Sequence, residues 1–327
     1  MKPAPFDYYS PRSVAEACQL LAEASGAAAV LAGGQTLMPL LALRMSQPLV
    51  IVDINKIEAL QGIARVVQAT RIGSVVRQNE IIANVTLQQN LPVLVSATRH
   101  VGHHQTRNRG TLGGSIALGE PAAELPATAC ALGASIDVCS VRGKRRIRAD
   151  EMYLAPYATA LEPDELIVAV EYPDWPAHSV PVFREVAMRP GDFALVGLVG
   201  MLTVENGHVS RAGIAWFGMG PTPMKARRAE AALIGQPVSG LDIQGIAELA
   251  IADTAPLDDR HARAGRHQLS QRDDVHRSGA QRAHPPGTGG RPRRRRAGTH
   301  KQDHYLGGCI GRNALDVPHG VCQPRGT

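Results

Sequence analysis

Cysteine is scarce in this sequence, and the cysteines that are present stand far apart. No C-x-x-C pair occurs among the five, which are Cys18, Cys130, Cys139, Cys309 and Cys322. Iron–sulfur clusters and structural zinc sites need closely spaced cysteines, so we expect neither in this chain, and no other metal site. Scattered cysteines are also typical of a reducing compartment, which predicts a cytoplasmic protein.

Long apolar runs and the common phosphate-binding motifs are missing as well. No uninterrupted run of about 18 apolar residues is present, so no membrane span is expected. The opening MKPAPFDYYS has one lysine and no apolar segment behind it, so we expect no signal peptide. GxGxxG does not follow a predicted strand and GxxxxGK[ST] does not occur, which argues against a standard Rossmann site and a P-loop.

The excess of positive charge is confined to one part of the chain. The formal net charge is +6, but residues 257–327 hold 14 of the 35 Lys and Arg and 6 of the 29 Asp and Glu. The remaining 21 basic and 23 acidic residues leave 1–256 close to neutral. The basic character therefore says little about the partners of the main body.

Residues 257–327 also lack helical or alternating apolar patterns. They contain 7 of the 12 histidines and the run Arg293 to Arg296. We weigh three interpretations: a disordered tail, a nucleic-acid-binding arm, and a shifted reading frame. We favour the shifted frame, because the basic sequence starts where another apolar helix should close the preceding domain. Resequencing the gene tests it, and an intact frame would refute it.

The first 55 residues carry the pattern of a small α/β unit. Apolar residues at helical spacing follow Ser13, which we expect to cap a helix in a capping box with Glu16. The apolar segments 27–32 and 49–54 are predicted to be buried strands, the second in a parallel sheet. Between them we expect a helix capped by Thr36, whose apolar face carries Leu37, Leu40, Leu41 and Met45.

The middle of the chain is predicted to mix helices and strands. We expect a strand and turn over 69–77, an exposed strand and turn over 144–153 and a strand over 165–173. A helix should follow the proline of 91–102, and 124–141 should form a short helix and then a strand.

A proline-rich segment, 174–183, is a plausible domain boundary. Beyond it, two apolar strands within 194–220 are joined by Asn206-Gly207, a strong hairpin signal. Helices are expected over 224–235 and 242–253. The pattern predicts a small α+β second domain.

Two glycine pairs call for a common explanation. Gly33-Gly34 follows a predicted strand and precedes a helix, and Gly113-Gly114 is likewise followed by a small polar residue, Ser115. Glycine permits positive φ and close approach of a ligand to the backbone, and a helix N-terminus favours anions. One such turn is most simply a tight turn, whereas two favour a clamp on the pyrophosphate of a dinucleotide.

These segments resemble the FAD-binding medium subunits of the molybdenum hydroxylases, the xanthine oxidase/carbon monoxide dehydrogenase family. AGGQTLMPLLALRM, RNRGTLGGSIA, EPAAELPA and RPGDFALVG occur in the family's order, within a resemblance that covers about residues 1–256. It implies an α+β fold: a PCMH-type FAD-binding domain over 1–175, with α/β subdomains of about 1–55 and 56–175. A small α+β C-terminal domain over 176–256 and the basic tail 257–327 would follow.

The resemblance also implies which residues bind FAD, and it implies no catalytic residue in this chain. Two loops would hold the pyrophosphate, Glu124 would reach the ribityl hydroxyls, and three further residues would lie near the flavin. Leu118 and Glu120 replace a histidine and an aspartate that are common in the family. The full implied set is Ala32, Gly33, Gly34, Gln35, Thr36, Thr111, Leu112, Gly113, Gly114, Ser115, Glu124, Ile167, Arg184 and Asp192.

The family's division of labour implies a cytoplasmic heterotrimer. A large subunit would hold molybdopterin and oxidise the substrate, and a small subunit would hold two [2Fe–2S] clusters. Electrons would pass through those clusters to FAD in this chain and on to an external acceptor. The substrate stays open among N-heterocycles, aldehydes and carbon monoxide, and so does the acceptor.

Other classes of protein remain possible at this point. One is a stand-alone PCMH-type flavin oxidoreductase, such as an alcohol oxidase or a MurB-like reductase, acting on its own substrate. A second is a nucleotide-binding assembly factor, which titration of FAD against ATP would separate. A third, resting on the tail alone, is a nucleic-acid-binding protein, although we expect no nucleic-acid partner.

Overall fold

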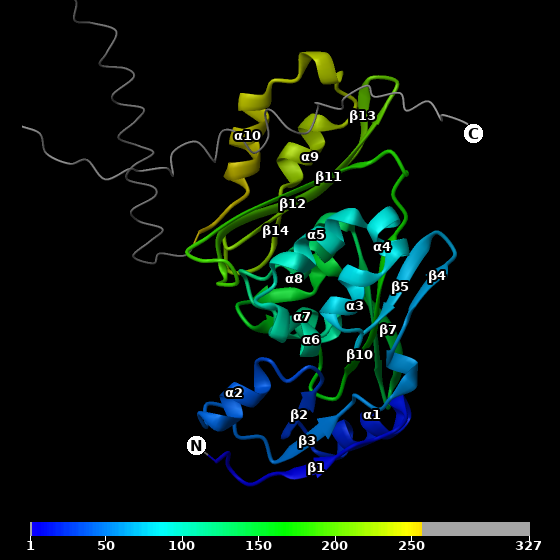
Figure 1. Ribbon diagram of the computed structural model, residues 1–327, viewed down its shortest axis with the longest axis vertical. Coiled ribbons are helices and arrows are strands. Elements are labelled where there is room, and N and C mark those ends of the chain that lie inside the picture. The colour runs from blue at the N-terminus through cyan, green and yellow to red at the C-terminus, as the bar shows by residue number, and fades with distance from the viewer. Residues whose placement is uncertain (1, 257–327) are drawn as a thin grey trace, which may run out of the picture. The chain divides into compact units, whose positions relative to one another are not determined.

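The N-terminal unit is a three-stranded parallel sheet with two connecting helices. The computed structural model describes residues 2–256, and its first sheet has the order β1 (Asp7–Tyr9), β3 (Val50–Asp53), β2 (Ala28–Leu31). Both pairings are parallel, which confirms the parallel sheet expected around segment 49–54. The helices α1 (Val14–Glu23) and α2 (Leu37–Ala42) join these strands (Figure 1). The three interpretations of 257–327 concern residues outside the described range.

Ser13 caps α1 as predicted, but the capping box is displaced. Ser13 Oγ accepts a hydrogen bond from the Glu16 N–H at 3.1 Å. The Glu16 carboxylate accepts from the N–H of Arg12 at 3.0 Å, one residue before the cap. The entry to the helix is fixed on both sides, and α1 buries Ala17, Cys18 and Leu21.

The helix α2 is shorter than predicted and begins without a side-chain cap. Thr36 makes no capping hydrogen bond, and Met45 lies beyond the helix with 73% of its surface exposed. The cause is Arg44, whose left-handed backbone (φ 57°) ends the helical path. The predicted apolar face is therefore correct only as far as Leu41, which is buried.

The second sheet is antiparallel and has its longest strand in the middle. Its order is β4 (Ile63–Val66), β5 (Ala69–Gly73), β10 (Leu166–Pro173), β6 (Ser135–Ser140), β7 (Gly143–Arg148). The strands predicted near 69–77, 135–141, 144–153 and 165–173 are all present. A short hairpin adds β8 (Tyr153–Ala155) and β9 (Ala158–Thr159), and one-turn 3₁₀ helices occupy Glu58–Leu60 and Ala149–Glu151.

Six helices lie between β5 and β6 in the chain. The helices predicted over 91–102 and at 124 are present, as α5 (Pro92–His100) and α8 (Glu124–Leu132). Four others carry too few turns to show a period and were not predicted. They are α3 (Gln78–Ala83), α4 (Val85–Asn90), α6 (His104–Arg109) and α7 (Leu112–Leu118).

The third sheet is an antiparallel meander of β11 (Val180–Ala187), β12 (Ala194–Glu205), β13 (His208–Phe217) and β14 (Met224–Lys225). Asn206 and Gly207 form its central turn with φ of 52° and 75°, the left-handed pair typical of a tight hairpin. The helix predicted over 224–235 starts late, as α9 (Arg227–Leu233), because Met224 and Lys225 pair with β13 instead. The chain continues through a 3₁₀ turn at Val238–Gly240 to α10 (Ile243–Ala252).

Both faces of β12 are covered, which explains its continuous apolar sequence. Val199 and Met201 belong to the large core that includes α5 and α8, and Leu198 belongs to the core under α9 and α10. Figure 1 shows α5 and α8 against one face of this sheet and α9 and α10 against the other. The second and third sheets therefore share one continuous core.

Candidate functional site

The first glycine pair lies where β2 leaves its sheet. Residues 32–36 connect β2 to α2. Gly34 has a φ of 71°, in the left-handed region that favours glycine. Gly33 touches a distant segment, since a Cβ there would lie 2.4 Å from the carbonyl oxygen of Arg109. Both glycines are thus required by the path of the backbone.

This connection offers unused backbone donors. Within residues 2–256, the N–H groups of Gly33, Gly34, Gln35 and Thr36 have no hydrogen-bond acceptor. The carbonyl of Gly33 accepts from the Gln35 side-chain amide at 3.2 Å, which orders the loop. Consecutive free N–H groups ahead of a helix form a concave site for an anion.

The second glycine pair differs from the expectation, because it lies inside a helix and its donors are engaged. The Gly113 N–H donates to the Ser74 carbonyl at 2.8 Å, and the Gly114 N–H donates to Thr111 Oγ1 at 3.0 Å. The Ser115 N–H donates to the Thr111 carbonyl at 3.2 Å. A clamp of free N–H groups therefore has only one side, and the second segment contributes hydroxyl groups and space.

Gly113 is required by packing. A Cβ at this position would lie 2.5 Å from the Ser74 Cβ and 2.7 Å from the Ser74 carbonyl oxygen. The absence of a side chain lets α7 lie directly on the turn after β5. The two glycine segments also approach each other, since a Cβ at Gly114 would lie 3.9 Å from the Ala32 Cβ.

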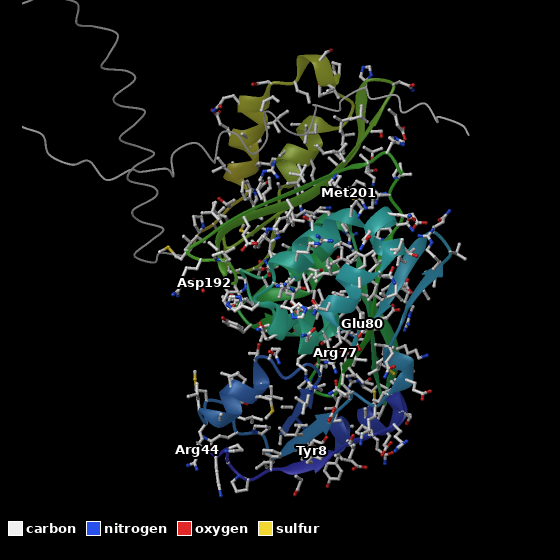
Figure 2. All side chains as sticks on the ribbon, in the orientation of Figure 1. Tyr8, Arg44, Arg77, Glu80, Asp192 and Met201 are labelled. Carbon is white, nitrogen blue, oxygen red and sulfur yellow. The ribbon has the colours of Figure 1, made fainter. Side chains whose placement is uncertain are left out.

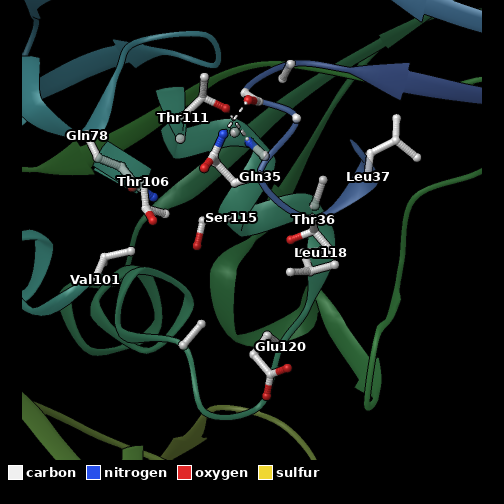
Figure 3. A pocket seen from close by; sticks show the side chains of 18 of the residues that line it. Gln35, Thr36, Leu37, Gln78, Val101, Thr106, Thr111, Ser115, Leu118 and Glu120 are labelled. Carbon is white, nitrogen blue, oxygen red and sulfur yellow. Dashed lines mark hydrogen bonds between the residues drawn. The ribbon is translucent and has the colours of Figure 1, made fainter. Parts of the chain in front are cut away.

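A cavity of about 560 Å³ lies between the two glycine segments. This volume falls in the usual range for small-molecule and cofactor sites. In the view of Figure 3, Gln78 and Thr106 lie on one side, Thr36 and Leu118 on the other, and Ser115 between them. Twelve of the implied site residues line it: Ala32, Gly33, Gly34, Gln35, Thr36, Thr111, Gly113, Gly114, Ser115, Glu124, Ile167 and Asp192.

Leu112 and Arg184 do not line this cavity. Leu112 is completely buried in the large core, so its side chain contributes packing. Arg184 is exposed on β11 and donates to the Phe183 carbonyl at 2.8 Å. These two side chains therefore lie outside the cavity lining formed by the other twelve.

The charged side chains that line the cavity are all acidic. Glu120 accepts from the Ala122 N–H at 3.1 Å and from the Tyr157 hydroxyl, and this contact raises the pKa of Tyr157 to about 12. Glu165 is held by Arg145 through two bonds of 2.6 and 2.7 Å. Asp192 pairs with Arg189 at 3.0 Å. An anionic ligand would thus depend on backbone donors, since no Lys, Arg or His side chain in the described part of the chain lines the cavity.

Glu124 differs from the other acids because it is almost fully buried. It starts α8 with 4% of its surface exposed. Burial raises its pKa to about 8, and the nearby Glu185 adds to the shift while Arg107 opposes it. At neutral pH this carboxyl group is largely protonated, so it can donate a hydrogen bond as well as accept one.

Two buried polar side chains line the cavity without belonging to the site predicted from the sequence. Ser74 and Gln78 are 2% and 4% exposed, yet Ser74 Oγ and Gln78 Oε1 have no partner within residues 2–256. Buried polar atoms are normally paired, so these two atoms fit a polar ligand in the cavity. No local pattern marks them, because their segment meets the second glycine pair through contacts between residues far apart in the chain, such as the bridge between Arg77 and Thr111.

The third sheet contributes one loop to the site. Gly191, Asp192 and Phe193, between β11 and β12, line the cavity. Phe193 is 62% exposed, although it is a large aromatic side chain. The family motif marks Asp192 in this loop, whereas no sequence pattern marks Phe193, since the exposure of an aromatic side chain is not visible in a sequence. All three sheets therefore supply residues to one cavity.

Residues 2–256 contain neither a candidate metal site nor a candidate membrane span. No cluster of three or more His, Cys, Asp or Glu side chains could hold a metal ion. None of the helices in that range has the length and apolar character to cross a membrane.

Two family models match the chain. "FAD binding domain in molybdopterin dehydrogenase" matches residues 4–175, and "CO dehydrogenase flavoprotein C-terminal domain" matches residues 181–269. Together they cover most of the sequence.

Individual relatives agree with these models. The chain is 39% identical to the 6-hydroxypseudooxynicotine dehydrogenase complex subunit alpha of Paenarthrobacter nicotinovorans, over 81% of this chain and 90% of that one. It is also 39% identical to the caffeine dehydrogenase subunit beta of a Pseudomonas species, over 73% and 81%. A chain of the carbon monoxide dehydrogenase structure from Hydrogenophaga pseudoflava superimposes with a TM-score of 0.76 at 35% identity, covering 79% of this chain and 90% of that chain.

Proposed function

This chain belongs to the FAD-binding medium subunits of the molybdenum hydroxylases, and on that basis we propose that it carries electrons from the [2Fe–2S] clusters of a partner subunit to an external acceptor. It is a flavoprotein subunit of an oxidoreductase complex of the carbon monoxide dehydrogenase type. We propose as partners a large molybdopterin-binding subunit and a small subunit with two [2Fe–2S] clusters. Bound FAD would supply the electron-transfer chemistry.

The row of free N–H groups at Gly33 to Thr36 is the observation that carries this proposal. A diphosphate is the part of FAD that needs donors, and these four groups meet it in a cavity without a basic side chain. A lysine or arginine in this cavity would pair with one of its four carboxyl groups. Backbone N–H groups carry no full charge, so they stay available to the ligand. This arrangement fits a resident dinucleotide better than a turn with no ligand.

Other residues of the cavity would orient the rest of the molecule. Glu124 in its protonated form can donate to a ribityl hydroxyl, and Ser74 Oγ and Gln78 Oε1 can accept from hydroxyl or amino groups. Ile167 offers an apolar surface in a largely buried strand. These groups bind and orient, and none of them is required to transfer a proton.

The alternative of a stand-alone flavin oxidoreductase gains no specific support from the site. Relatives that match over 79% to 81% of this chain are named as a complex subunit or as medium chains. Activity of the isolated chain on a substrate of its own would revive that alternative.

The test is a visible absorption spectrum of the complex purified with its partners. We expect flavin absorption, release of FAD on denaturation, and about one FAD per chain. A Gly33→Val variant should lose FAD, because the side chain would collide with the Arg109 carbonyl. Gly240→Ala is the control, since the atom nearest to its Cβ position is 4.0 Å away and the residue lies outside the cavity. A folded wild-type complex that binds ATP and takes up no FAD would refute the proposal.

We propose an N-heterocycle as the substrate of the complex. Two relatives at 39% and 35% identity are named for caffeine and nicotine, whereas the carbon monoxide dehydrogenase chains match at 33% and 32%. Reduction of the bound flavin by purines or pyridines, monitored by bleaching of its absorption, would support this choice. Bleaching by carbon monoxide or aldehydes alone would refute it.

A further inference from the structure

Arg77, which lies outside the cavity, takes part in hydrogen bonds that reach both glycine segments. The Arg77 guanidinium donates through Nη1 to the carbonyl of Arg109, the residue that touches Gly33. Through Nη2 it donates to Asn55 Oδ1 at 2.6 Å. The Asn55 amide in turn donates to the Ala32 carbonyl at 2.8 Å, directly before Gly33. A continuous chain of hydrogen bonds therefore joins the two segments through Arg77.

The orientation of Asn55 is fixed by a further pair of residues. Asp53 Oδ1 accepts from the Asn55 side-chain amide at 2.6 Å and from its backbone N–H at 3.0 Å. The other oxygen of Asp53 accepts from the Tyr8 hydroxyl at 2.5 Å. Because the Asn55 side-chain NH₂ group donates to Asp53 and to the Ala32 carbonyl, its oxygen Oδ1 points toward Arg77. Figure 2 places Tyr8 in the N-terminal sheet and Arg77 beside the helices α3 and α6.

Arg77 is held in one position by partial burial and by its two hydrogen-bond acceptors. Arg77 is half-buried, and burial together with the neighbouring Arg109 lowers its pKa, while Glu80 and Asp53 oppose that shift. A planar guanidinium can serve two acceptors in different directions at once, which a lysine ammonium does with less directional control. Arg77 does not line the cavity, so it acts through the segments that do.

We propose that Arg77 is a positioning residue that sets the spacing of the two glycine segments and thereby the preference for a dinucleotide over a mononucleotide. This inference rests on the proposed FAD site. The free N–H groups at Gly33 to Thr36 can serve the single phosphate of FMN as well as the diphosphate of FAD. A ligand that continues toward Gly110 and Thr106 also needs the second segment at the right distance, and Arg77 holds that segment by the Arg109 carbonyl.

The test compares FAD with FMN on the purified complex after removal of its flavin. We expect Arg77→Lys to weaken FAD binding about tenfold, the effect of losing one charge-assisted hydrogen bond, with a much smaller change for FMN. Asn55→Ala should have the same effect, and the double variant should be no worse than either single one, because all three break one bridge.

The control is Arg211→Lys. Arg211 is also half-buried, donates to the Asp174 carbonyl at 2.8 Å and stacks on Trp175, but lies outside the cavity. Its replacement should lower the melting temperature and leave the FAD-to-FMN affinity ratio unchanged. An unchanged ratio in Arg77→Lys, or equal losses for FAD and FMN, would overturn the positioning role. A wild-type complex that takes up no FAD would instead overturn the proposed function.

Discussion

Glu124 shows how the setting of one residue decides its chemistry. It shares the cavity with Glu120, Glu165 and Asp192, but these three acids have strong donors close by. For Glu124, loss of solvent outweighs the field of Arg107, and its pKa rises to about 8. A family motif can mark the position of such a carboxyl group but not its protonation state, which depends on burial by residues far away in the chain.

This shift predicts a pH dependence for the flavin-free chain. The folded state keeps the Glu124 proton up to about pH 8, whereas the unfolded chain loses it near pH 4.5. Folded chains thus bind more protons between these values, and the free energy of unfolding should fall as pH rises through that window. Urea denaturation at several pH values should show this slope in the wild type and a much smaller slope in Glu124→Gln. The exposed Glu151→Gln serves as control, and an unchanged slope in Glu124→Gln would contradict the assignment.

Gly113 gives a second prediction at this scale. Its replacement by alanine would force a methyl group to within 2.5 Å of the Ser74 Cβ, with backbone on the same side. We expect a loss of about 2 kcal/mol or more in unfolding free energy, since the Ser74 Cβ and carbonyl oxygen cannot move away without a shift of the backbone. Gly240→Ala is matched to it, because the nearest atom there is 4.0 Å away, and it should change stability by less than about 0.5 kcal/mol. Chemical denaturation of both variants tests the contrast, and equal effects would contradict it.

At the scale of elements, the hairpin between β12 and β13 was predictable because its signal is local. Asn206 and Gly207 both take positive φ, which few other residue pairs accept. Gly207→Ala should therefore lower the unfolding free energy by about 1 kcal/mol, while Asn206→Gly should cost less than about 0.5 kcal/mol. Thermal melts of the two variants check the order. A larger loss for Asn206→Gly would mean that the Asn206 side chain, rather than the backbone, holds the turn.

Elements whose signal is not local escaped prediction. The helix α1 was predicted because Ser13 and its apolar spacing lie within one segment, but α3, α4 and α6 are too short to show a period. The helix α7, capped by Thr111, was not predicted because the glycine pair in its first turn was interpreted as a turn. The engagement of the Gly113 N–H depends on Ser74, nearly forty residues away. The sequence thus predicts the positions of the glycine segments but not which of them keeps its donors free.

At the scale of the whole molecule, the site belongs to no single sheet. Gly33 to Thr36 follow the first sheet, Thr111 to Ser115 and Glu124 lie with the second, and Asp192 and Phe193 belong to the third. The continuous core beneath the second and third sheets fixes two of these groups relative to each other. The N-terminal unit, which carries Gly33 to Thr36, is joined to the second sheet in part through the hydrogen bonds of Arg77.

A ligand in this cavity should consequently stabilise the molecule as a unit. At a hundred times its dissociation constant, FAD should add about 2.7 kcal/mol to the unfolding free energy of the flavin-free complex, by mass action alone. For a chain of this size, that corresponds to a rise in melting temperature of roughly 5 to 10 °C. FMN at the same concentration should give a smaller rise, since it lacks the second phosphate and the adenosine of FAD. Differential scanning fluorimetry with FAD, FMN and riboflavin measures the series. Equal shifts for FAD and riboflavin would mean that the diphosphate adds no binding energy, and the four free N–H groups would then have no part in recognition.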